Sequence, residues 1–392
     1  MRILATAACG RVSGIVRNIL GAGACAAALL GAAGAAQAGP TLKFGDDESL
    51  SFGLGMRTSA TWDEHGASDG SSNYTANLDS VRLYVNGQVT KWLGATFNTE
   101  WNGKGSIQVL DGFARFEPTD GFNIWVGHLL PPSDRSNLDG PYYLSSWNYP
   151  GVVSQYPARF AGRDDGVTVW GKLFARKLTY AVGVFRGHDH IAGAAAHSGE
   201  PLVAGRVAFN FWDVEDNPGY FESSTYYGAA NILTLAFAGM YQKNGVGTAA
   251  VRGNYASWNV DGLMEHKVFD GGAVTLEGAY YHYSTGGVFD VSPSFNNADP
   301  NDNVGGLTQG NAFLISGGFL FPQPVGPGKF QPVVRYQEFH ATLTDRKTRQ
   351  IDASLNYILK GHSARVSLDY AHSETTGSGD DDRVTAGLQL QF

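Results

Sequence analysis

The feature that most constrains this chain is an alternation of apolar and polar side chains, with a period of two residues, that recurs from Leu50 onward. It is clearest over 383–392, where the apolar residues all share one parity: Val384, Ala386, Leu388, Leu390 and Phe392. Successive side chains of a β-strand point to opposite faces. Each such stretch therefore predicts a strand with one apolar and one polar face.

The alternation appears about sixteen times along the chain. Most of the predicted strands are about 9–14 residues long, which is enough to cross a bilayer at a tilt. We place the strand cores at 50–60, 79–90, 93–101, 106–117, 122–130, 165–174, 177–186, 203–213, 228–241, 254–267, 273–285, 311–321, 329–340, 347–359, 362–373 and 383–392.

Membrane-spanning helices are not expected after residue 38, because no apolar run there approaches the roughly 20 residues that such a helix needs. Charged residues make up 16% of the chain, whereas about 25% is usual in soluble domains. One-sided strands with so little charge favour an all-β fold, a transmembrane antiparallel β-barrel of about 16 strands whose apolar face meets lipid. A soluble β-sandwich is the alternative.

Residues 1–38 have the pattern of a cleaved secretory signal peptide, with an A-x-A site at 36–38. The alternative is an uncleaved anchor, which the weak hydrophobicity of its Ala and Gly residues disfavours. We therefore expect a signal at 1–38 and an outer-membrane barrel at 39–392. The basic part of the signal carries three arginines: Arg2, Arg11 and Arg17.

Loss of the signal changes the charge and the cysteine content. The formal net charge of the chain is −8, and removal of three arginines makes it −11. An acidic chain without a basic patch argues against nucleic-acid binding. Both cysteines, Cys9 and Cys25, lie in the signal, so the mature barrel has no thiolate to ligate a metal. We expect no cofactor and no metal.

The connections alternate in length, as they do in outer-membrane barrels. With both chain ends in the periplasm, the even-numbered connections face the periplasm, and most of them are tight turns, such as 91–92 and 175–176. The long connections are mostly odd-numbered and therefore extracellular: 61–78, 131–164, 187–202 and 286–310. One connection, 214–227, breaks the rule because it is even-numbered and yet long.

Three short stretches resemble the phosphate-selective porins O and P: Leu110 to Pro118, Ile124 to His128, and Arg163 to Val167. The resemblance spans most of the mature chain. It implies a sixteen-stranded barrel that is usually a homotrimer and has its third extracellular loop folded into the pore. That loop corresponds here to 131–164. Separately, Gly387, Leu390 and Phe392 match the general outer-membrane assembly signal, which implies insertion by the barrel assembly machinery.

Parity also predicts which charged side chains line the pore. The basic ones on polar faces are Arg82, Arg115, Lys172, Arg206, Arg335, Arg365 and Arg383. The acidic ones are Glu100, Asp111, Glu117, Asp261, Glu277, Asp352 and Asp369. The family's phosphate path is rich in arginine and lysine, whereas this lining is balanced. A balanced lining favours a field across the pore that orients dipolar solutes, although each single charge is more often a solvated side chain.

The in-folded loop contributes charged residues of its own: Asp134, Arg135, Asp139, Arg159 and Arg163. We expect Arg82 and Arg115 to face Asp134 and Asp139 across the passage. The aromatic residues of the loop predict an ordered segment that packs against the inner wall rather than a mobile tip.

The resulting hypothesis is an outer-membrane porin for passive diffusion of small hydrophilic solutes or ions, with phosphate among the candidates. Outer-membrane lipid and lipopolysaccharide are its expected surroundings. Barrel enzymes are the first alternative, but they need a nucleophile–base set, and His188-Asp189-His190 lies in a predicted loop without a serine motif nearby. A structural barrel that sheathes a partner protein is the other alternative.

Overall fold

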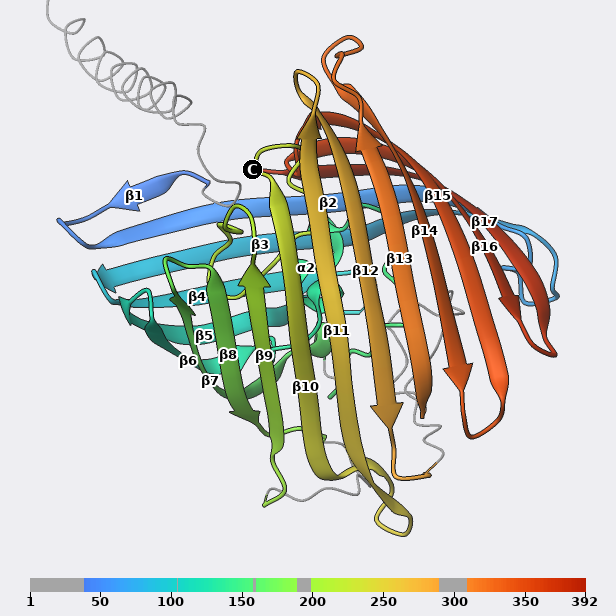
Figure 1. Ribbon diagram of the computed structural model, residues 1–392, viewed down its shortest axis with the longest axis horizontal. Coiled ribbons are helices and arrows are strands. Elements are labelled where there is room, and N and C mark those ends of the chain that lie inside the picture. Colours follow the sequence, from blue (N-terminus) through green and yellow to red (C-terminus); the bar gives the residue numbers. More distant parts are fainter. Residues whose placement is uncertain (1–38, 104, 158–159, 189–198, 289–308) are drawn as a thin grey trace, which may run out of the picture.

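The computed structural model describes residues 39–103, 105–157, 160–188, 199–288 and 309–392. Sixteen long strands, β2 to β17, each pair antiparallel with the next strand in the sequence, and β17 pairs with β2, which closes the ring. Figure 1 shows these tilted strands side by side around a barrel. The predicted fold, a closed antiparallel barrel of sixteen strands, is confirmed. The signal predicted at 1–38 lies outside the described residues.

The strands and helices follow the chain in a simple order. They are β1 (Thr41–Lys43), β2 (Ser49–Asp63), β3 (Asn73–Thr90), β4 (Leu93–Trp101), β5 (Gln108–Thr119), β6 (Phe122–Leu129), α2 (Arg135–Tyr143), η1 (Phe160–Gly162), β7 (Asp164–Leu173), β8 (Leu178–Phe185), β9 (Leu202–Asn210), β10 (Ile232–Gly247), β11 (Arg252–Val268), β12 (Gly272–Ser284), β13 (Gly310–Leu320), β14 (Lys329–Ala341), β15 (Arg346–Lys360), β16 (Ala364–Thr375) and β17 (Gly379–Gln391). In the described part of the chain, no helix is long and apolar enough to cross a bilayer.

Each predicted strand core overlaps one barrel strand, and the differences are at the ends. The short strand β1, which pairs with the start of β2, was not predicted. Strand β3 begins at Asn73, so the connection predicted at 61–78 is shorter than expected. Strand β10 begins later than predicted and continues to Gly247, because its pairing with β11 resumes at Val246 after an irregularity.

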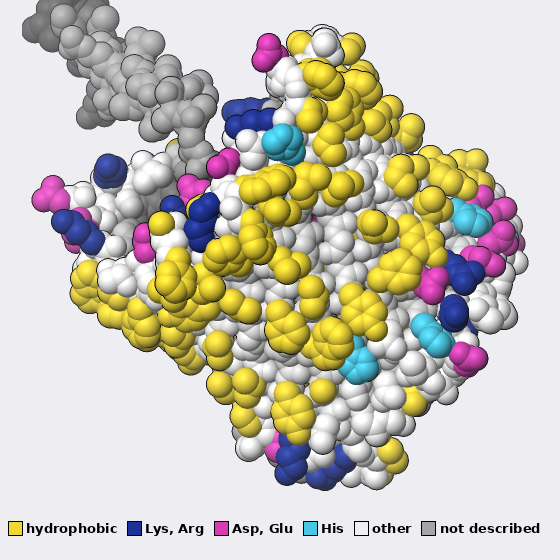
Figure 2. Space-filling model, in the orientation of Figure 1, with side chains coloured by type: hydrophobic (Ala, Val, Ile, Leu, Met, Phe, Trp, Pro, Cys, Tyr) yellow, Lys and Arg dark blue, Asp and Glu magenta, His cyan; other side chains and the backbone are white. Residues whose placement is uncertain are grey.

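The two faces of the barrel differ as the alternation predicts. On β15, Ile351 and Leu355 are exposed on the outer face, whereas Asp352 and Asn356 on the inner face are fully buried. Figure 2 shows hydrophobic side chains over the middle of the strands, with charged side chains near their ends. The inner side chains are buried because two connections fold into the lumen and pack against them.

Candidate functional site

The first connection in the lumen is the inner loop, which we define as residues 130–163 between β6 and β7. It enters through α2, which begins after Asp134, whose carboxylate accepts a hydrogen bond from the backbone N–H of Asn137. Such a cap satisfies a helix N-H that has no partner within the helix. The helix is interrupted at Gly140, which has a φ of 60°, a value that favours glycine, and Pro141 follows it. The chain then turns along the wall.

The arginines of the wall bind the backbone of the inner loop. Arg365 donates to the carbonyl of Leu144 at 2.6 Å, and Arg57 donates to that of Trp147 at 2.7 Å. Arg335 donates to the carbonyl of Asn148 at 2.9 Å. Asn356 and Gln389 bind further carbonyls of the loop. These donors hold residues 142–148 of the loop against the inner wall, which agrees with the packing that its aromatic residues predicted.

Glycines on neighbouring strands leave room for the aromatic rings of the loop. The ring of Trp147 lies over Gly387 of β17, where an added Cβ would be 2.5 Å from a ring carbon. The ring of Tyr142 covers Gly55 of β2 in the same way. The guanidinium of Arg57 lies 4.0 Å from the Trp147 ring centroid, a cation–π contact that adds to the hydrogen bond.

The second connection in the lumen is the plug segment, which we define as residues 211–231 between β9 and β10. It contains the connection 214–227, which is longer than the tight turn expected of an even-numbered connection. Its central residues 220 and 222–225 are buried inside the barrel. The Tyr220 hydroxyl donates to the Leu130 carbonyl at 2.7 Å, and the Ser224 N–H donates to the Tyr143 carbonyl at 3.2 Å. The plug segment therefore contacts both the beginning of the inner loop and the end of α2.

Aromatic packing fixes the plug segment to the wall. The ring centroids of Trp125 and Tyr220 are 5.0 Å apart, and Phe221 lies on the same indole at 5.9 Å. Gly219 has a φ of 60° and lies directly against the Trp125 ring, so a side chain has no room there. Rings at these separations attract beyond the apolar area that they bury.

Buried ion pairs join the two inward connections and the wall. Arg135 of α2 makes a bidentate pair with Glu215 of the plug segment, with both bonds at 2.8 Å. Arg206 of β9 pairs with Glu222 at 2.7 Å and with Asp261 of β11 at 2.6 Å. Burial favours the neutral form of Glu215, but Arg135 outweighs it and lowers the pKa of this carboxyl to about 2.

Three further carboxyl groups lie near these ion pairs: Asp134, Asp139 and Glu277. Asp139 accepts a hydrogen bond from the Ser224 hydroxyl at 2.6 Å. Burial and the nearby Glu277 raise the pKa of Asp139 well above its usual range. Burial and Asp261 raise the pKa of Asp134 to about 7. The centre of the lumen is thus richer in carboxylates than in guanidinium groups.

No family model matches the chain, and no curated protein matches its sequence. Solved structures match it. An anion-selective porin from Comamonas acidovorans has a TM-score of 0.57 at 14% identity, with 88% of this chain and 100% of that chain covered. OmpF of Salmonella typhi, in complex with daunomycin, has a TM-score of 0.58 at 12% identity, with 90% and 100% covered. The trimer form of in-vitro folded OmpT of Vibrio cholerae has a TM-score of 0.53 at 12% identity, with 88% and 100% covered.

The fold is that of the porins. At these identities the likeness concerns the fold alone. It agrees with the barrel architecture that the sequence resemblance implied. The loop inside the barrel, which the resemblance also implied, is seen in this structure itself. The likeness does not support the narrower assignment to the phosphate-selective porins O and P, because the matching structures include porins of different description.

Within this barrel, the predicted lining charges lie on the inner side, but most of them pair with one another. Arg82 pairs with Glu100 at 2.8 Å, Arg115 with Glu117 at 3.2 Å, and Arg335 with Asp352 at 3.0 Å. Further members of the predicted set bind elsewhere: Arg163 pairs with Asp111, Lys172 donates to the Asn217 carbonyl, and Arg383 lies near Asp63.

We expected Arg82 and Arg115 to face Asp134 and Asp139 across the passage, and this arrangement is not observed. Each of these two arginines binds a glutamate of the wall. Asp134 caps α2 and binds Asn137, and Asp139, within α2, accepts a hydrogen bond from Ser224 of the plug segment. The odd or even position of a residue in its strand shows whether the side chain points inward. It does not show where along the barrel axis the side chain lies, or which residues are its neighbours. Arg159 of the predicted constriction lies outside the described residues.

Sequence reasoning missed Glu215 and Glu222, the two plug residues that bind the central arginines. They were assigned to a periplasmic turn because alternation does not extend into that segment. The length of the connection was the signal that could have identified them. A long connection at the end of the barrel that otherwise has tight turns suggests a segment that folds into the lumen.

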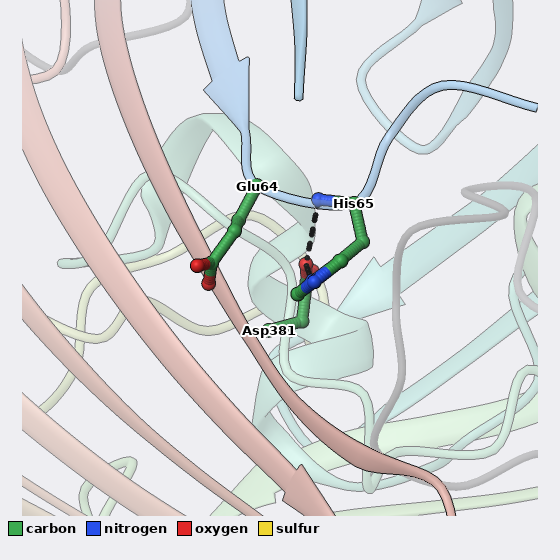
Figure 3. A group of neighbouring side chains, drawn as sticks. All are labelled: Glu64, His65 and Asp381. Atoms are coloured by element: carbon green, nitrogen blue, oxygen red, sulfur yellow. Dashed lines mark hydrogen bonds and ion pairs between the residues drawn. The ribbon is translucent and has the colours of Figure 1, made fainter. Parts of the chain in front are cut away.

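One cluster outside the lumen brings three potential metal ligands together. Glu64 and His65 follow β2, and Asp381 lies on the neighbouring β17, as Figure 3 shows. The His65 Nδ1 lies 3.2 Å from an Asp381 oxygen. His65 is half-exposed, and such a group is common on surfaces without an ion. His188 is buried against Tyr156, whereas the rest of the predicted histidine cluster lies outside the described residues.

Proposed function

We propose that this chain is an outer-membrane porin that lets small hydrophilic solutes diffuse passively through its lumen. The observation that carries the proposal is the closed barrel with an apolar outer face and a charged, hydrogen-bonding inner face, narrowed by the inner loop. An apolar exterior matches the bilayer core, and a polar interior matches a water-filled path. The matching porin structures favour this role over an enzymatic one, and we expect no hydrolytic activity.

The surroundings follow from the same geometry. The end of the barrel with tight turns would face the periplasm, and the other end would face lipopolysaccharide. Exposed aromatic residues next to strand ends, such as Trp92 and Trp212, suit the lipid headgroup level. Export would use residues 1–38, and the assembly machinery would read Gly387, Leu390 and Phe392. We propose a homotrimer, and one matching outer-membrane protein, OmpT of Vibrio cholerae, is described in a trimer form.

Narrowing by two connections points to a channel for small solutes. The inner loop and the plug segment meet in the middle of the lumen, so a solute passes between their side chains and the wall. Anions, including phosphate, are the alternative that the family resemblance suggests. Against it, the arginines Arg57, Arg335 and Arg365 are engaged by loop carbonyls.

Electrical recording of the purified protein in planar bilayers tests the function. We expect stable single-channel steps, and we expect a larger conductance when 144–153 is replaced by a short Gly-Ser linker. A matched control shortens 66–71, an exposed connection at the same end. The absence of channel activity from folded protein would refute the proposed function, and equal conductance in both variants would refute the role of the loop.

A further inference from the structure

A small cavity lies where α2, the plug segment and the wall of β12 to β14 meet. Most of its lining side chains present oxygen atoms: Ser136, Ser145, Ser146, Ser224, Glu277 and Ser316. Leu144, Pro150, Leu314 and Arg335 complete the lining. Arg335 is engaged by Asp352 at 3.0 Å and by the Asn148 carbonyl at 2.9 Å. The cavity is therefore a polar site built from three separate segments.

Carboxyl groups outnumber guanidinium groups around this cavity. Besides Arg335, which pairs with Asp352, two buried arginines, Arg135 and Arg206, lie near the cavity. The same region contains six further buried carboxyl groups: Asp134, Asp139, Glu215, Glu222, Asp261 and Glu277. The arginines form ion pairs with Glu215, Glu222 and Asp261. In the described residues, neither Asp139 nor Glu277 forms an ion pair. Buried carboxylates without a counter-charge are costly.

Two of the oxygen atoms at this place also lack a hydrogen-bond partner in the described part of the chain. One is the Ser146 hydroxyl, which lines the cavity in a residue that is 2% exposed. The other is a carboxylate oxygen of Asp139, a residue that is 4% exposed and does not line the cavity itself but binds the lining residue Ser224 through its second oxygen. Burial and Glu277 raise the pKa of Asp139, as expected of two like charges that share a site. A bound cation removes both deficits, since hard cations take carboxylate and hydroxyl oxygens as ligands.

We propose that this cavity binds a hard cation, or the ammonium group of a solute, and that it gives the channel a preference for cations. The inference rests on the proposed function. The site depends on tertiary packing, because Ser146 comes from the inner loop, Ser224 from the plug segment and Glu277 from β12. Glu277 supplies a carboxyl group in the lining, and the serine hydroxyls supply neutral ligands. Asp139 adds a second carboxyl group next to the lining through its hydrogen bond with Ser224.

The reversal potential in asymmetric potassium chloride tests the preference. We expect cation selectivity in the wild-type channel and a several-fold lower cation-to-anion permeability ratio in the double variant Asp139→Asn, Glu277→Gln. The matched control is Asp345→Asn, which removes a charge from an exposed turn. Anion selectivity of the wild type, or an unchanged ratio in the double variant, overturns the inference. A protein that forms no channels refutes the proposed function instead.

Terbium luminescence provides a second measurement that does not need transport, with Tb³⁺ as the probe for oxygen ligands. Ser146→Ala leaves every charge in place and should weaken Tb³⁺ binding several-fold, whereas Asp381→Asn serves as a control for the surface cluster. Displacement by calcium indicates a metal cation, and displacement by putrescine indicates an ammonium group. Binding that Ser146→Ala leaves unchanged, but that Asp381→Asn abolishes, overturns the inference.

Discussion

Gly387 is a residue of the wall on which the Trp147 ring of the inner loop packs directly. A larger side chain there meets the Trp147 ring, since even a Cβ would be 2.5 Å from it. Overpacking of this kind typically costs about 1–3 kcal/mol. We expect Gly387→Leu to displace Trp147, to weaken its contact with Arg57 and to increase the single-channel conductance.

A matched control for this change is Ala386→Leu, because Ala386 lies on the outer face of the same strand. It should leave the conductance unchanged. Heat-modifiability on gels checks that both variants fold, which also separates the packing role of Gly387 from its place in the assembly signal. Equal conductance of the two folded variants would contradict the packing argument.

Asp134 is the residue that should make docking of the inner loop depend on pH. Burial and Asp261 raise its pKa to about 7, while Arg206 and the hydroxyl of Tyr281 lie nearby. A raised pKa means that the protonated form favours the docked loop. Docking should therefore be strongest below about pH 4, weaken as the pH rises to about 7, and change little above it.

Current noise from loop motion, recorded from about pH 5 to 9, checks this dependence. Asp134→Asn keeps a good helix cap and should reduce the rise in noise between about pH 5 and 7. The control Asp345→Asn should retain it. A wild-type noise level that does not change with pH speaks against a role for Asp134.

The plug segment differs from the other connections at its end of the barrel, because most of those are tight turns and this one folds into the lumen. It contributes the Glu215 carboxylate to Arg135 and the Glu222 carboxylate to Arg206, besides its aromatic contacts with Trp125. Replacing 214–226 by a tight turn should empty part of the lumen and roughly double the conductance.

Two variants make this measurement specific. Shortening 322–327, a turn at the same end, should leave the conductance near the wild-type value. Glu215→Gln combined with Glu222→Gln keeps the segment but leaves Arg135 and Arg206 with fewer counter-charges. Breaking buried pairs costs about 3–5 kcal/mol each, so this variant should show intermediate conductance and more noise. An unchanged conductance after deletion would mean that the plug segment does not obstruct the path.

The whole barrel depends on an apolar outer face in contact with lipid. Leu355 is 44% exposed near the middle of β15. An arginine at the bilayer midplane costs about 2–4 kcal/mol, so Leu355→Arg should lower the stability of the folded barrel in lipid vesicles. Val325→Arg places the same charge at an exposed turn residue and should have a small effect. Urea titration of both variants tests the lipid-facing assignment; equal stabilities would contradict it.

The amino-acid sequence by itself determined the strands of this protein and the faces that they present. Alternation is a local property, because the direction of a side chain follows from its position in its own strand. Residues such as Ile351 and Asp352 were therefore assigned to the correct faces without knowledge of the fold. The number of strands and the presence of a loop inside the barrel followed from the same pattern, from connection lengths and from a family resemblance.

Only the tertiary structure decided what the inner side chains bind. Arg135 and Glu215 are 80 positions apart, and their pairing depends on two connections that both turn into the lumen. The period of an alternating pattern carries no information about the path of a connection or about the stagger between strands. The balanced charge count was accordingly incomplete, because Glu215 and Glu222 entered the lumen from a segment without any strand pattern.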